Sequence, residues 1–244
     1  MYLDAYFEAM DGVLAAIRET QRAAIVKAGR AVARSLAKSG TVQVMDTGHM
    51  LRHEAYFRAG GLMALVPFSY DLSVENPIET REVKRSGKQE AELEARKVAL
   101  ALDSSTMRRG DVLIVNSNSG RTPNVIEVAR QCKDRGITTV AISSAEQMRK
   151  CAAAHPSGKK LFDVADICID NCGPHGDALV KVHGNEKMCP GSGIGSVYVF
   201  WAIQAEAVQR LEAKGIKPSI FRSVHVSGHE YIEKQRKRFL KRGI

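Results

Sequence analysis

The sequence has no long apolar run, few aromatic residues and an odd number of cysteines. None of its apolar stretches reaches the roughly 18 residues that cross a bilayer, and the N-terminus lacks a basic segment followed by an apolar one. We therefore expect a cytoplasmic protein with no membrane partner. Five cysteines in 244 residues are an odd number. That count does not fit a secreted disulfide scaffold, so free thiols are expected.

Positive charge is in excess, but it is not arranged as nucleic-acid-binding sequences usually arrange it. The chain has 36 lysines and arginines against 27 aspartates and glutamates, a formal net charge of +9, which permits anionic partners. Six basic residues crowd the end of the chain: Lys234, Arg236, Lys237, Arg238, Lys241 and Arg242. Aromatic residues make up only 6%, and only Phe239 lies among these charges. Base stacking has little support, and we do not expect a nucleic-acid partner.

Strand and helix patterns alternate along most of the chain. Residues 1–40 carry helical apolar spacing. Beyond them, strands are predicted at 41–45, 64–68, 111–115, 137–142 and 164–169, and helices at 50–58, 90–102, 123–135 and 195–213. Such alternation predicts an α/β fold, a parallel sheet with helices on both faces, in which ligands bind at the carboxyl ends of the strands.

One loop between a predicted strand and a predicted helix has the composition of an anion site. It reads Ser117-Asn-Ser-Gly-Arg-Thr122 and is followed by Pro123, which suits the first position of a helix. The free N–H groups of a first helical turn, the helix dipole and three hydroxyls are suited to phosphate. A Ser/Thr-rich helix cap without a ligand is the alternative reading of the same residues.

The segment DVLIVNSNSGRTPNVIEVARQCKDRGITTVAISS, residues 111–144, resembles the phosphate-binding core of SIS (sugar isomerase) domains. More narrowly, the chain resembles the UPF0309 proteins, near phosphoheptose isomerase. Supporting stretches lie at 55–61, 164–171, 176–178, 205–207 and 215–218. The turn 44–49, VMDTGH, departs from the Gly-rich turn that the family pattern has there.

The resemblance implies a three-layer αβα sandwich that binds a sugar phosphate as a homodimer or homotetramer. It implies one SIS domain over residues 1–244, with N-terminal helices (1–40), an α/β core (41–213) and a basic C-terminal extension (214–244). The residues that match the phosphate site or are expected to bind substrate are Ser117, Asn118, Ser119, Gly120, Thr122, Ser143 and Asp177. Asp177 is included because it follows a predicted strand in a Gly-containing loop, 171–177, where it can accept hydrogen bonds from sugar hydroxyls.

Aldose–ketose isomerisation through an enediol needs a base, and ring opening needs an acid. Glu54 follows the first strand, where several SIS enzymes place a glutamate, and is the expected base. His49 and His225 are the candidates for proton transfer. An exposed, purely structural Glu54 is the alternative. A phosphosugar lyase or etherase, or a non-catalytic phosphosugar sensor, are the other functions that the resemblance allows.

No cofactor is expected. His49 and His53 are four residues apart and could share one helix face, so zinc is an alternative there, but no third ligand is fixed by spacing. Cys168, Cys172 and the later His and Cys residues fit no common zinc module. The segment Gly191-Ser-Gly-Ile-Gly195 lacks the spacing of a dinucleotide-binding loop and is read as a helix start.

Overall fold

A parallel sheet forms the centre of the protein. The computed structural model describes residues 1–47, 54, 56–75, 78–81 and 83–244. Within these ranges the sheet has five strands in the order β2-β1-β3-β4-β5, all parallel. The strands are β1 (Val42–Asp46), β2 (Leu65–Pro67), β3 (Val112–Asn116), β4 (Thr138–Ser143) and β5 (Ile167–Asp170). The predicted α/β fold is confirmed.

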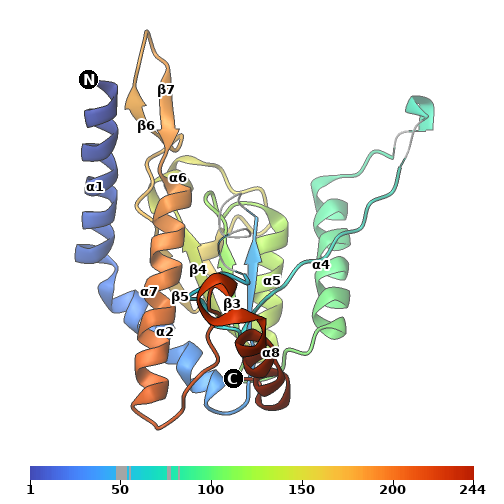
Figure 1. Cartoon of the computed structure of the whole chain (residues 1–244). Coiled ribbons are helices and arrows are strands. Elements are labelled where there is room, and N and C mark those ends of the chain that lie inside the picture. Colours follow the sequence, from blue (N-terminus) through green and yellow to red (C-terminus); the bar gives the residue numbers. More distant parts are fainter. Residues whose placement is uncertain (48–53, 55, 76–77, 82) are drawn as a thin grey trace.

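Helices cover both faces of the sheet, which makes three layers (Figure 1). One face packs against α1 (Tyr2–Thr20), α2 (Arg22–Leu36) and α7 (Ser192–Glu212). The other face packs against α4 (Gly87–Ser104) and α5 (Pro123–Asp134).

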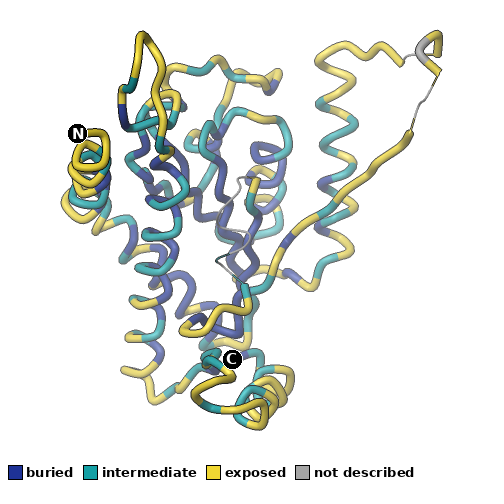
Figure 2. Tube along the Cα trace, turned by 45° about the horizontal axis from the view of Figure 1, so that its top comes forward, coloured by how far each residue is buried: buried dark blue, intermediate teal, exposed yellow. Residues whose placement is uncertain are grey.

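Side chains of the central strands alternate between these two cores. Ile114 and Ile142 join the first core, whereas Leu113 and Val115 join the second, and all four are fully buried. Burial on both faces explains why the strands read as continuous apolar runs. The buried residues lie along the sheet and the inner helix faces (Figure 2).

The five predicted strands and the predicted helices at 90–102, 123–135 and 195–213 are present, with differences at their ends. Helix α4 begins at Gly87, three residues before the predicted start, because Ser86 and Gln89 form a reciprocal capping box. Pro67 lies within β2, which it can do because β2 is an edge strand. The predicted helix 50–58 falls largely outside the described residues.

Several short elements carry no clear sequence signal. These are the 3-10 turns η1 (Glu79–Arg81) and η2 (Leu161–Asp163), helix α6 (Ala145–Lys150) and the antiparallel hairpin of β6 (Ala178–Lys181) and β7 (Lys187–Pro190). Strand β7 is mostly exposed and so lacks apolar alternation. The basic C-terminal segment forms α8 (Val224–Arg242), which is interrupted at Gly228 and buries none of its residues. None of the described helices is long and apolar enough to cross a membrane.

Candidate functional site

The loop 117–122 lies between the carboxyl end of β3 and the first turn of α5. All five residues of β3 are buried, so the strand sets the position of the loop. Pro123 occupies the first turn of α5, and Thr122 precedes it without capping the helix through its side chain. The first N–H groups of α5 therefore have no side-chain cap at Thr122 and remain available to a ligand.

Hydrogen bonds from neighbouring segments hold the carbonyl oxygens of this loop. Ser143 Oγ donates to the oxygens of Ser117 (2.5 Å) and Asn118 (3.1 Å). The oxygen of Asn118 also accepts from the Ser144 amide, that of Gly120 from Leu161, and that of Arg121 from Ala154. In the described part of the chain, the amides of Asn118, Ser119, Arg121 and Thr122 have no protein acceptor. The loop thus keeps four amide donors free, while the carbonyl oxygens of Ser117, Asn118, Gly120 and Arg121 are occupied.

Gly120 is required by this conformation. Its φ is +54°, and a Cβ there would lie 2.6 Å from Met148 Cε and 3.1 Å from both Leu161 Cβ and Ser143 Oγ. A residue with a side chain would be strained and would push against the segments that hold the loop.

The loop opens into a cavity of about 860 Å³. The loop contributes Ser117, Asn118, Ser119 and Thr122 to its wall. Other elements contribute Tyr6, Thr47, Asn116, Asn124, Gln147, Asp177, Cys189, Ser192 and Ser196. The wall therefore carries many hydroxyl and amide groups and receives residues from most of the chain, from Tyr6 to Ser196.

Asn171 joins the loop to α7. It is fully buried after β5, and its Nδ2 donates to Asn118 Oδ1 (3.2 Å) and to Ser196 Oγ (3.0 Å). Gly195 permits the close approach of α7, since a Cβ there would lie 2.4 Å from the Asn171 carbonyl oxygen. These contacts hold two walls of the cavity against each other.

Comparison with known proteins shows which family shares this arrangement. Residues 5–144, more than half of the chain, match the SIS domain family. The chain belongs to the SIS family. A UPF0309 protein of Caldanaerobacter subterraneus is 33% identical over 250 residues, covering 97% of this chain and 98% of the relative. A UPF0309 protein of Thermoanaerobacter pseudethanolicus is also 33% identical, over 249 residues and 97% of each chain.

Solved structures show the same SIS fold. Phosphoheptose isomerase from Francisella tularensis superimposes with a TM-score of 0.54 at 15% identity, covering 85% of this chain and 96% of that one. The phosphoheptose isomerase from Neisseria gonorrhoeae gives 0.51 at 16% identity, covering 84% and 97%. At these identities the likeness concerns the fold alone.

In this SIS chain the structure brings together five of the seven residues predicted to bind substrate: Ser117, Asn118, Ser119, Thr122 and Asp177 line the cavity. Gly120 is part of the loop but not of the cavity wall, and Ser143 supports the loop from behind. Asp177 has a second task, because its Oδ1 accepts hydrogen bonds from the amides of Ser192 (2.7 Å) and Gly191 (3.2 Å) at the start of α7.

Two of the three predicted catalytic residues, Glu54 and His225, lie outside the described cavity wall. Glu54 forms an ion pair with Arg58 (2.9 Å), its side chain is about one third exposed, and it is not part of the described cavity wall. His225 is exposed on α8 and is also outside that wall. His49 and His53 lie outside the described residues. The assignment of all three catalytic roles stays a prediction.

Sequence reasoning missed cavity residues that come from distant elements. Tyr6 reaches the wall from α1, far from the loop in sequence, and no local pattern indicates this. Gln147 lies on the short helix α6, and its Oε1 accepts from the Gly176 amide (2.8 Å), which fixes the segment before Asp177. The polar composition of α6 gave no sign of this role.

The cysteines are free thiols. Burial raises the pKa of Cys132 to about 12, and burial likewise raises the pKa of Cys168 and Cys172. These three sulfurs are therefore protonated and poorly nucleophilic at neutral pH.

Among the residues that the structure describes, no group of three or more His, Cys, Asp or Glu could hold a metal ion.

The support that Ser143 gives the loop can be tested by removing its hydroxyl. We expect Ser143→Ala to lower the free energy of unfolding in urea by about 1 kcal/mol, because a buried hydroxyl donor is lost while both carbonyl oxygens keep a backbone amide donor. Ser73→Ala, in an exposed segment, is the control and should stay within about 0.5 kcal/mol of wild type. Equal stability of the two variants would contradict this role for Ser143.

Proposed function

We propose that this SIS-family chain binds a sugar phosphate, with the phosphate on the loop 117–122 and the sugar in the adjoining cavity. The observation that carries the proposal is the loop itself. The carbonyl oxygens of Ser117, Asn118, Gly120 and Arg121 accept hydrogen bonds within the protein. The free amides of the loop, the N-terminus of α5 and the hydroxyls of Ser119 and Thr122 remain as donors. Such a set of preorganised donors favours a phosphate dianion over a neutral group.

The rest of the cavity suits a sugar. Its volume of about 860 Å³ lies within the range of small-molecule sites, roughly 300–1,000 Å³. Asn124, Gln147, Ser192 and Ser196 offer donors and acceptors that match sugar hydroxyls. The two phosphoheptose isomerases that share the fold act on sugar phosphates according to their names, which supports the same class of ligand.

We propose aldose–ketose isomerisation as the reaction. A base removes the proton from the carbon next to the carbonyl and returns it to the former carbonyl carbon, while a proton moves between the two oxygens of the enediol. We assign the base to Glu54 and proton transfer to His49 or His225. Glu54 follows Thr47, which lines the cavity, by seven residues, and β1 ends at the same edge of the sheet as β3. A lyase or etherase reaction at the same site is the related alternative.

A non-catalytic phosphosugar-binding module is the second candidate. In the described wall, Asp177 is the only carboxylate, and one of its oxygens already caps the start of α7. A wall with hydroxyl and amide groups but no free base would bind a sugar phosphate without converting it. The proposal for turnover therefore depends on Glu54.

A homodimer or homotetramer in the cytoplasm belongs to the same proposal. His225 lies on exposed α8, away from the cavity wall of its own chain, so it would act in the site of a neighbouring copy. Light scattering of the purified protein should give the mass of two or four chains. The mass of a single chain would contradict a role of His225 in the reaction.

Binding can be tested at Ser119. A panel of hexose and heptose phosphates first identifies the sugar phosphate that binds most tightly. We expect Ser119→Ala to raise its dissociation constant about tenfold, because one hydrogen bond to a charged group is lost. Isothermal titration calorimetry measures the change. Ser227→Ala, on α8, is the matched control and should bind as wild type does. Unchanged affinity in Ser119→Ala would contradict the proposal that the phosphate binds to this loop.

Turnover can be tested at Glu54. Glu54→Gln keeps the shape of the side chain but removes the base, so we expect loss of at least a hundredfold in the exchange of the C2 proton with deuterated solvent, with affinity unchanged. Proton NMR of the bound sugar phosphate in heavy water follows the exchange. Full exchange in the variant would reject Glu54 as the base, and no exchange with wild type would favour the binding module.

A further inference from the structure

A second hollow lies at the opposite end of the sheet and is lined by cations. It has a volume of about 460 Å³ and lies where α2, the end of α5 and the first residues of β4 and β5 meet. We call it the basic hollow and define it by Lys27, Arg34, Lys133, Thr138 and Asp166.

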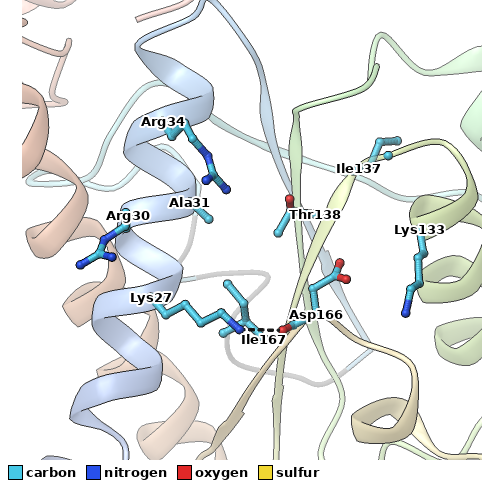
Figure 3. A pocket seen from close by; sticks show the side chains of 10 residues that line it. Lys27, Arg30, Ala31, Arg34, Lys133, Ile137, Thr138, Asp166 and Ile167 are labelled. Carbon is cyan, nitrogen blue, oxygen red and sulfur yellow. Dashed lines mark hydrogen bonds between the residues drawn. The ribbon is translucent and has the colours of Figure 1, made fainter.

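The cations of the basic hollow come from two helices on opposite faces of the sheet. Figure 3 shows Lys27 and Arg34 extending from α2 toward the strands and Lys133 approaching from the side of α5. Arg30 is also part of the wall, but its guanidinium turns away from the hollow in this view. Three positive groups therefore surround one space.

Cations outnumber carboxylates in the basic hollow, since Lys27, Arg34 and Lys133 share its described wall with the single carboxylate of Asp166. In the part of the chain that the structure describes, Lys27, Arg30, Arg34 and Lys133 form no ion pair. Lys27 Nζ donates to the main-chain oxygen of Asp166 (3.2 Å). The Asp166 carboxylate is engaged elsewhere, since its Oδ2 accepts from the amide (2.8 Å) and the hydroxyl (3.0 Å) of Thr139. Like charges that face one space repel each other, and a bound multivalent anion relieves that repulsion.

The spacing of the cations indicates the size of the anion. Lys27 and Arg34 are seven residues apart on one helix, about 10 Å along its axis. A chain of two or three phosphates can contact cations spread over this span at several points, whereas a single phosphate would have to draw their long side chains together at a cost in side-chain entropy. We propose that the basic hollow binds a small molecule through a diphosphate or triphosphate group, which is a site separate from the phosphate loop.

The two sites lie at opposite ends of the same elements. Thr138 in the basic hollow begins β4, and Ser143, which holds the phosphate loop, ends it. Thr138 and Ser143 are five residues apart along the strand, which corresponds to about 16–17 Å. Helix α5 likewise begins at the loop and ends beside Lys133 and Gly136. One ligand therefore cannot occupy both sites.

Calorimetric titration of the full chain with inorganic triphosphate at about 50 mM salt tests the proposal. We expect saturable binding by wild type that weakens at least tenfold in Arg34→Gln/Lys133→Gln. Both side chains are exposed, so the variant should fold as wild type does, which its melting curve checks. The matched control Lys234→Gln/Arg236→Gln removes the same charge from α8 and should bind normally.

Two further measurements distinguish triphosphate binding in the basic hollow from sugar phosphate binding at the phosphate loop. Ser119→Ala/Thr122→Ala should still bind triphosphate, and loss of binding in that variant alone would assign triphosphate to the phosphate loop. Orthophosphate should bind at least tenfold more weakly than triphosphate. Absence of saturable binding by wild type, equal weakening in the α8 control, or equal affinity for orthophosphate would each overturn the basic hollow as a polyphosphate site.

Discussion

The candidate site depends on the hydrogen bonds that hold the carbonyl oxygens of the loop 117–121. Ser143 at the end of β4, the amide of Ser144 and the segments at 154 and 161 supply these donors. A loop of this composition could turn either its amides or its carbonyls toward a ligand. Because four of these five carbonyls are occupied, the amides are left for an anion. The parallel sheet brings the supporting groups to the same edge.

The fold was predictable because its signals are local. Buried strands such as Val112–Asn116 appear as continuous apolar runs, and the loop shows its turn through Gly120 and Pro123. The position of Ser143 was predictable but its role was not, since the distinction between contacting a ligand and holding the loop depends on where its hydroxyl points. Tyr6 and the exposed strand β7 were missed because their places in the cavity are fixed by tertiary packing alone.

The two ends of the sheet have different chemistry. At the carboxyl ends, hydroxyls, amides and free backbone N–H groups surround the larger cavity. At the amino ends, unpaired lysines and arginines surround the smaller one. Neutral donors with fixed geometry select a ligand by shape, whereas flexible cations attract charge with less demand on shape. The lysines and arginines of the basic hollow are part of the formal net charge of +9.

The central claim is that the cavity beside the phosphate loop takes a sugar phosphate. A thermal-shift comparison of the metal-stripped protein with hexose and heptose phosphates and with the corresponding free sugars tests it most directly, because a ligand that binds only the folded chain raises its melting temperature. We predict a rise with at least one sugar phosphate and none with its free sugar. No rise with any sugar phosphate, or the same rise with a free sugar, would contradict the claim.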